Sequence, residues 1–296
     1  MPERVAVVGP GAIGSVCAAA VQQAGRYKTV LCGRRDPGRI TVANERTGEK
    51  TVLPGPVLTS PADVHGPVDW VLLAVKAHQT AATAGYLSAL CDEDTTVVVL
   101  QNGVEHRERV MPLVGQAAVL PAIVWFGAES VASNHVVLRA GSRIMVPSGE
   151  AGDRFASLMH GGMTLVETVD DFTTELWRKL TSNAVGGLMA LTGRPAGIYR
   201  REDIQELARA MAAECLAVAR AEGARLDDTV GGELVDALAA MAPGLGSSIL
   251  ADRVACRPLE WEARNGVVRR LGRRHGIATP VSDVVVPLLA ATSESG

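Results

Sequence analysis

The chain has 296 residues, of which 47% are hydrophobic and 21% charged, which is typical of a globular protein large enough for two domains. A formal net charge of -3 argues against nucleic-acid binding, and no apolar run reaches the ~20 residues needed to span a membrane. Five scattered cysteines without a C-x-x-C pair argue against a disulfide framework or a zinc site. Because residues 1–4 lead directly into a strand-like run, we expect no signal peptide and a cytoplasmic location.

The first motif is a glycine-rich turn between a strand and a helix. Residues 4–8 form a short β-branched run, and residues 15–24 form a helical run closed by glycine. In the intervening G-x-G-x-x-G, Gly9 allows a tight turn, Gly11 lets the backbone reach a pyrophosphate, and Gly14 lets helix and strand pack closely. A glycine-rich turn alone is weak support, but this strand–turn–helix context predicts a dinucleotide site.

The end of the second predicted strand indicates which dinucleotide binds. Residues 27–32 form this strand, and an NAD enzyme would place an acidic residue after it for the ribose. The chain has Arg34 and Arg35 instead, and guanidinium groups suit a 2′-phosphate. We therefore expect NADPH rather than NADH. The alternatives are that both arginines are simply solvated, or that Asp36 binds the ribose.

Two later strands also end in polar residues. Residues 68–75 are followed by Lys76, and residues 95–100 are followed closely by Asn102. Ligands bind at the carboxyl ends of strands in open α/β sheets, so we expect both side chains to face cofactor or substrate. The alternative for Asn102 is that it forms a turn with Gly103.

The remaining pattern divides the chain into two parts. We expect only short strands in the loop-rich segment 38–67, and further strands over residues 119–125, 135–146 and 165–169. From residue 171 the pattern is helical, with helices expected over residues 174–191, 202–221, 229–241, 246–253, 258–274 and from 280 onward. The sequence therefore predicts an α/β fold, in which an N-terminal Rossmann-type, doubly wound, mainly parallel sheet (1–170) precedes an all-α C-terminal domain (171–296).

The helix predicted over residues 174–191 combines an apolar stripe with polar residues. Lys179 and Asn183 are four positions apart and share a face beside that stripe. Gly186 and Gly187 each cost about 1 kcal/mol in a helix, which indicates that another backbone or a ligand comes close. Taken alone, Lys179 is more simply a half-exposed structural lysine.

Together these pieces resemble the ketopantoate reductase (2-dehydropantoate 2-reductase) family over nearly the whole chain. The matching pieces are residues 9–14, Arg34, 75–79, 100–103, 176–180 with Asn183, Ser247–Ser248 with Asp252, and Glu260 ahead of Asn265-Gly266. The resemblance implies an NADPH-dependent reductase that transfers a hydride to the ketone of a small 2-oxo acid. The expected substrate is 2-dehydropantoate, and the expected pathway is pantothenate biosynthesis.

The resemblance also implies a role for each matching residue. It makes Lys179 the general acid and Glu260 the carboxylate that orients substrate and lysine, with Asn183, Ser248 and Asn102 binding the substrate. It assigns the cofactor to Gly9, Pro10, Gly11, Ala12, Ile13, Gly14, Arg34, Lys76, Asn102 and Glu260. The chemistry agrees, because hydride addition places negative charge on the ketone oxygen, which an ammonium group stabilises and protonates. No metal ligand is expected. The simpler alternative for Glu260 is a surface ion pair with Arg264.

Two positions depart from the family pattern. Gly187 and Leu245 stand where the family often has asparagine, so hydrogen-bond partners for a small hydroxy acid are lost. One alternative is therefore a reductase of a different ketone or 2-oxo acid in a specialised pathway, with the glycine pair leaving room for it. A non-catalytic NADP-binding regulator is less favoured, since such a protein would need none of Lys179, Ser248 and Glu260. The expected partners are a small-molecule substrate and, in a homodimer, a second copy of the chain.

Overall fold

The computed structural model describes residues 4–25 and 27–294, which form two compact units. The first unit runs to Gln101 and continues from Glu105 to Phe172. The second unit comprises Asn102–Val104 and the chain from Thr173 onward. The predicted domain 1–170 includes Asn102, whereas the contacts of this residue group it with the helical unit. The reason is that Asn102 is hydrogen-bonded to residues of that unit and Val104 packs into its core.

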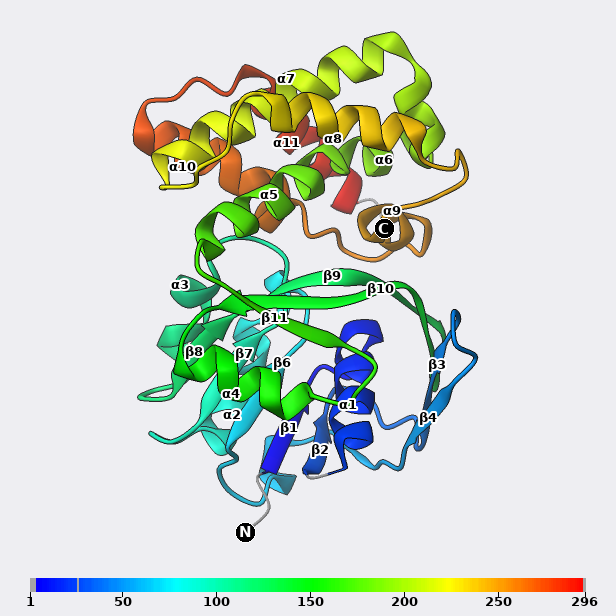
Figure 1. Ribbon diagram of the computed structural model, residues 1–296, viewed down its shortest axis with the longest axis vertical. Coiled ribbons are helices and arrows are strands. Elements are labelled where there is room, and N and C mark those ends of the chain that lie inside the picture. The colour runs from blue at the N-terminus through cyan, green and yellow to red at the C-terminus, as the bar shows by residue number, and fades with distance from the viewer. Residues whose placement is uncertain (1–3, 26, 295–296) are drawn as a thin grey trace. The chain divides into compact units, whose positions relative to one another are not determined.

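The first unit is built on a six-stranded parallel sheet (Figure 1). Its strands, in spatial order, are β5 (Val57–Leu58), β2 (Lys28–Cys32), β1 (Arg4–Val8), β6 (Trp70–Leu73), β7 (Thr96–Val99) and β8 (Ala118–Pro121). Numbered by chain position, this is the order 3-2-1-4-5-6 of a doubly wound nucleotide-binding sheet. The predicted fold class is thus confirmed. The order reverses between β1 and β6, where such sheets bind their ligands.

A second sheet was not expected from the sequence. It contains β3 (Ile40–Asn44), β4 (Lys50–Leu53), β9 (Ile123–Ala132), β10 (His135–Pro147) and β11 (Leu165–Val169). Its order is β11-β10-β3-β4, and β9 pairs with β10 in antiparallel orientation. The single strand predicted over residues 119–125 is divided between the two sheets, at Ala122. Pro121 has no N–H to continue a ladder, which favours the end of β8 there.

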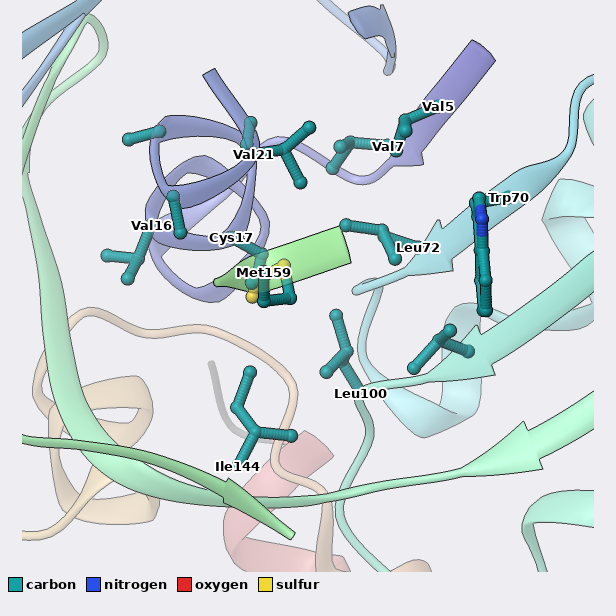
Figure 2. Close-up of a cluster of buried hydrophobic side chains, with 14 of the residues drawn as sticks. Val5, Val7, Val16, Cys17, Val21, Trp70, Leu72, Leu100, Ile144 and Met159 are labelled. Atoms are coloured by element: carbon teal, nitrogen blue, oxygen red, sulfur yellow. The ribbon is translucent and has the colours of Figure 1, made fainter. Parts of the chain in front are cut away.

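Helix α1 (Ala12–Ala24) packs against both sheets of the first unit. Every residue from Gly14 to Val21 is buried, and three consecutive alanines let the surrounding backbone come close. Figure 2 shows this core, in which Val21 of α1 faces Val7 of the parallel sheet and Leu72 belongs to the same cluster. Ile144 of β10 belongs to the same core. The turn that precedes α1 is therefore held on a rigid base.

Alternate residues of the central strands face opposite layers. Val5 and Val7 contribute to the core around α1, whereas Ala6 and Val8 pack in the core around α2 (Ala84–Leu90). This two-sided burial explains why the central strands are continuous apolar runs. The unit also contains α3 (His106–Val110), α4 (Glu150–Met159) and the 3₁₀ helices Pro61–Asp63, Ala77–Gln79, Ala81–Thr83 and Met111–Leu113.

The described part of the second unit is helical, without a strand. Its helices are α5 (Phe172–Val185), α6 (Gly187–Thr192), α7 (Glu202–Ala221), α8 (Thr229–Ala240), α9 (Ser248–Val254), α10 (Val267–His275) and α11 (Pro280–Glu294), with the 3₁₀ helix Ala196–Arg200. The single helix predicted over residues 174–191 is wrong, because the chain breaks at Gly186 into α5 and α6. Within the described ranges, no helix is both long and apolar enough to cross a bilayer.

The helix predicted over residues 258–274 also differs from the structure. The segment Pro258–Glu260 is not helical, and Glu262–Gly266 forms a π-helical turn before α10 begins. π-helical turns inside α-helices are often found at functional sites, because they redirect side chains. Here the turn carries Arg264, which is buried.

Candidate active site

The glycine-rich turn after β1 is shaped by close backbone contacts. Gly9 has a φ of +93°, and a Cβ atom there would lie 2.6 Å from Val75 Cγ1. A Cβ on Gly14 would lie 2.2 Å from the carbonyl oxygen of Gly9, so neither position tolerates a side chain. At Gly11 no described atom lies within 4 Å of such a Cβ. The turn is thus closed towards the protein and open at Gly11, as a backbone that approaches a pyrophosphate requires.

Helix α1 begins directly after this turn. Gly11 is its N-cap residue and provides no side-chain cap, so first-turn N–H groups can serve a phosphate. Ser15 was not predicted as part of the site. Its hydroxyl donates to the carbonyl oxygen of Pro10 at 2.9 Å, and the residue is fully buried. The sequence could have indicated this bond, because a serine on the buried face of an apolar helix needs a hydrogen-bond partner for its hydroxyl group.

The segment after β2 fits a 2′-phosphate better than a ribose hydroxyl. Arg34 and Arg35 are exposed there. The competing candidate, Asp36, accepts hydrogen bonds from the backbone N–H groups of Val57 at 3.0 Å and Gly38 at 2.9 Å. These bonds lower the pKa of Asp36. Its carboxylate therefore anchors the loop, and two cationic side chains stand where an NAD-specific site would place an acid.

The end of β7 is held by a buried network that the sequence did not reveal. Gln101 donates to Thr80 Oγ1 at 2.8 Å and accepts from Arg109 Nη1 at 3.1 Å. The carbonyl oxygen of Gln101 lies 2.9 Å from His106 Nε2. Burial, and secondly the charge of Arg109, lower the pKa of His106 to about 4, so this histidine is neutral at pH 7. Lys76 is half-buried and lies between the end of β6 at Leu73 and the 3₁₀ helix Ala77–Gln79, which leads to Thr80.

Four of the predicted substrate and catalytic residues meet in the second unit. Asn102 Nδ2 donates to Glu260 Oε2 at 3.0 Å, and Asn183 Nδ2 donates to Asn102 Oδ1 at 3.1 Å. Arg264 extends the chain of bonds, because its Nη2 donates to Asn183 Oδ1 at 2.8 Å and its Nη1 to Ser248 Oγ at 3.4 Å. The network Glu260–Asn102–Asn183–Arg264–Ser248, called the polar network below, joins residues up to 158 positions apart.

The surface ion pair considered for Glu260 and Arg264 is wrong. Glu260 is 4% exposed and Arg264 is 3% exposed, so both belong to the interior. The four-residue spacing suggested a solvated helix face, but Glu260 precedes the helix and Arg264 lies on the π-helical turn. Arg264 is accordingly the main site residue that sequence reasoning missed.

Lys179 has the electrostatic properties of a proton donor. It is half-buried on α5, four residues before Asn183. Burial, and secondly the positive charge of Arg264, lower the pKa of Lys179 from 10.5 to about 8. The ammonium group stays protonated at neutral pH but releases its proton more readily than an ordinary lysine. The solvated lysine of the simpler interpretation would not show this shift.

The space beside Gly187 is already filled. A Cβ there would lie 3.1 Å from Asn265 Oδ1 and 3.3 Å from Leu289 Cδ1. Asn265 Nδ2 also donates to the carbonyl oxygen of Ala184 at 2.9 Å. Gly187 is therefore needed for helix packing, and the idea that it leaves room for a bulkier ketone is wrong. Leu245, the other departure from the family pattern, is 48% exposed and adds no polar group.

Comparison with known proteins identifies the family. Residues 5–150 match the family model for ketopantoate reductase PanE/ApbA, and residues 171–293 match its C-terminal model. The 2-dehydropantoate 2-reductase of Mycobacterium tuberculosis (strain ATCC 25618 / H37Rv) is 50% identical over 294 residues, 99% of each chain. The chain belongs to the ketopantoate reductase family. It is accordingly an oxidoreductase that reduces a ketone with NADPH, as the exposed arginines after β2 predicted.

Two further relatives agree with this family. The 2-dehydropantoate 2-reductase of Caulobacter vibrioides is 41% identical over 293 residues, 98% of this chain and 99% of the relative. The crystal structure of a PanE/ApbA family ketopantoate reductase from Ralstonia eutropha JMP134 superposes with a TM-score of 0.87 at 27% identity, over 99% of both chains. The alternative of a non-catalytic NADP-binding regulator has no support among these relatives.

Proposed function

We propose that this ketopantoate reductase reduces 2-dehydropantoate to pantoate with NADPH, as the names of its full-length relatives at 50% and 41% identity state for them. The observation that carries the proposal is the polar network beside Lys179. It offers two amides, a carboxylate, a hydroxyl and a guanidinium to one small molecule. Such a set suits a substrate with a carboxylate, a ketone and a hydroxyl group.

Lys179 is the proposed general acid. Bound NADPH supplies the hydride that adds to the ketone carbon. The ammonium group of Lys179 stabilises the negative charge that develops on the ketone oxygen and transfers a proton to it. With a pKa of about 8, it is protonated in most molecules at pH 7 and is regenerated from solvent after turnover. In the product alcohol, the carbon that was the ketone carbon thus gains a C–H bond from the hydride, and its oxygen gains an O–H bond from the proton of Lys179.

The polar network is proposed to orient the substrate for this step. Glu260 accepts a hydrogen bond from Asn102 and thereby fixes the orientation of the Asn102 amide. Asn183 and Ser248 stand on α5 and α9, so their hydrogen bonds to substrate come from separate rigid elements. Holding the ketone in one orientation lowers the entropy cost of the chemical step. In the first unit, Gly9 to Gly14, Arg34 and Lys76 are the proposed cofactor contacts.

A substrate panel tests the proposal. We expect the highest kcat/KM with NADPH and 2-dehydropantoate, and a kcat/KM lower by roughly 10²-fold or more for 3,3-dimethyl-2-oxobutanoate, which lacks only the 4-hydroxyl group. A site that hydrogen-bonds that hydroxyl leaves polar groups unpaired when the group is absent. Equal or better kinetics with the deoxy analogue, or with a 2-oxo acid of different skeleton, would reject 2-dehydropantoate as the substrate.

Two further expectations stay predictions. A cytoplasmic location agrees with a biosynthetic reaction that consumes NADPH. The homodimer is tested by the mass of the purified protein in solution, measured by light scattering at several concentrations. A constant mass of 30.9 kDa, that of one chain, would contradict it.

A further inference from the structure

Arg264 carries a buried charge that the protein neutralises only in part. It is 3% exposed, and its hydrogen-bond partners are two neutral oxygens, Asn183 Oδ1 and Ser248 Oγ. Within residues 4–25 and 27–294 no carboxylate forms an ion pair with it. Its Nε is buried without a hydrogen-bond partner among the described residues. A buried guanidinium in this state is costly unless an anion compensates it.

The surroundings of Arg264 show the same imbalance. Burial lowers the pKa of Arg264, and the fields of Glu260 and Asp252 oppose this effect without reversing it. Asp252 lies 3.3 Å from the guanidinium of Arg257, and Glu260 accepts from Asn102. Arginine stays protonated even so. The protein thus keeps a positive charge in its interior that its own carboxylates leave under-compensated.

One hydrogen-bond partner of the buried guanidinium is exposed to solvent. Ser248, which accepts from Nη1, is an exposed residue at the start of α9. Asn183, which accepts from Nη2, is one helical turn from Lys179. Arg264 also acts electrostatically on Lys179, so the two cations are near each other. An anion that joined Arg264 would lie beside both the proposed substrate amide and the proposed acid.

We propose that Arg264 binds the carboxylate of the 2-oxo acid and sets the preference of this enzyme for anionic ketones. The inference rests on the proposed function, in which the carboxylate is bonded directly to the ketone carbon. A planar guanidinium can hold a carboxylate through two parallel hydrogen bonds, which fixes its orientation as well as its position. The adjacent ketone is then directed towards Lys179. Arg264 in this way supplies a substrate contact that Gly187 and Leu245 do not.

The competing explanation is that Arg264 only positions Asn183 and Ser248. The two roles differ in what they do to an uncharged substrate. A positioning residue acts on every substrate alike, whereas a carboxylate ligand matters only when the carboxylate is present. The methyl ester of 2-dehydropantoate keeps the ketone and the hydroxyl group but has no charge, so it separates the two roles.

The test is steady-state kinetics on Arg264→Gln with the acid and with its methyl ester. Glutamine retains an N–H donor for Asn183 but removes the charge. We expect kcat/KM for the acid to fall roughly 10²- to 10³-fold, as for loss of one partner of a buried charge pair, mainly through KM. For the ester we expect a loss at least about tenfold smaller, because the contacts of Arg264 with Asn183 and Ser248 change but no charge pair with the substrate is lost. An equal loss for acid and ester would overturn the proposal and leave Arg264 a positioning residue.

Matched variants keep the test decisive. Arg274→Gln removes an exposed arginine of α10 and should leave both substrates unaffected. Arg264→Lys keeps the charge and should retain most of the preference for the acid over the ester, whereas complete loss of that preference would contradict a role for the charge itself. The fluorescence of Trp177, which is buried on α5 in the same unit as Arg264, reports whether each variant is folded.

A crystal structure of the unchanged protein with NADP⁺ and pantoate provides a test that needs no variant. We expect a carboxylate oxygen at about 3 Å from the guanidinium, the distance of a charge-assisted hydrogen bond. A carboxylate held elsewhere would overturn the proposal. If another 2-oxo acid proves to be the substrate, the acid and ester comparison is made with that compound. The assignment of 2-dehydropantoate as the substrate and the role of Arg264 are thus tested separately.

Discussion

Replacing Lys179 with methionine should slow the enzyme and stabilise the fold at once. Methionine has a similar length and no charge, so it preserves packing on α5. If Lys179 is the proton donor, kcat should fall by roughly two to four powers of ten, the scale of general acid catalysis. NADPH binding should be nearly unchanged, because the glycine-rich turn belongs to the first unit.

The stability gain follows from the pKa shift of Lys179. Its pKa is 10.5 in an unstructured chain and about 8 in the folded protein, so the fold disfavours the charged form. The cost is fully present below pH 8 and disappears as the pH rises from about 8 through 10.5. At about 1.4 kcal/mol per pKa unit, Lys179→Met should raise the free energy of unfolding by about 3 kcal/mol at pH 7, about 2 kcal/mol at pH 9 and less than about 1 kcal/mol at pH 10.

Urea unfolding at these three pH values measures the gain. Trp177, which is buried on α5, reports on the same unit by fluorescence. The control is Lys50→Met on β4, where the lysine is exposed and the change should stay within about 0.5 kcal/mol. A stability difference that does not depend on pH, or a less stable Lys179→Met protein, would refute the reasoning from burial. Turnover close to that of the unchanged enzyme would refute the assignment of the acid.

Four further predictions concern the cofactor, the polar network, the pH profile and the helix break. Arg34→Ala should raise KM for NADPH far more than for NADH, and equal effects on both would exclude a 2′-phosphate contact. Glu260→Ala should weaken substrate binding and slow turnover, with losses that are not additive with Lys179→Ala, as kinetics on the single and double variants can check. In the unchanged enzyme kcat should decline as the pH rises through about 8, because the acid loses its proton, and a kcat that stays constant to pH 10 would contradict this. Gly187→Ala should destabilise the protein by about 1 to 3 kcal/mol, because the new Cβ would lie 3.1 Å from Asn265 Oδ1, and urea unfolding measures the loss.

The nucleotide-binding half of the site could be predicted because its signals are local. The strand, the turn and the helix between Arg4 and Ala24 are consecutive, and the steric requirement at Gly9 and Gly14 involves their nearest structural neighbours. The position of Arg34 directly after β2 is also a local property. In each case, periodicity and residue type were sufficient to predict what the structure contains.

The second sheet and the helix break could not be read in the same way. Strand β3 pairs with β10 across about ninety residues of intervening chain, although β9 and β10 are consecutive strands. Their alternation shows that they are strands but not which sheet they join. Likewise, the apolar stripe continues past Gly186 and predicts one helix. The helix breaks there, beside Gly187, which lies close to Asn265 and Leu289.

The polar network depended on tertiary structure most of all. Asn102 and Glu260 are 158 residues apart and meet through a hydrogen bond that no local pattern encodes. Arg264 shows most clearly what the sequence alone could not predict. In the sequence it stands four residues after Glu260, a spacing typical of a solvated helix pair, whereas the π-helical turn and the surrounding helices bury its charge beside Asn183 and Ser248. Residue type and spacing determine which groups the chain can offer, but burial determines their charge balance, and burial arises only when distant segments pack together.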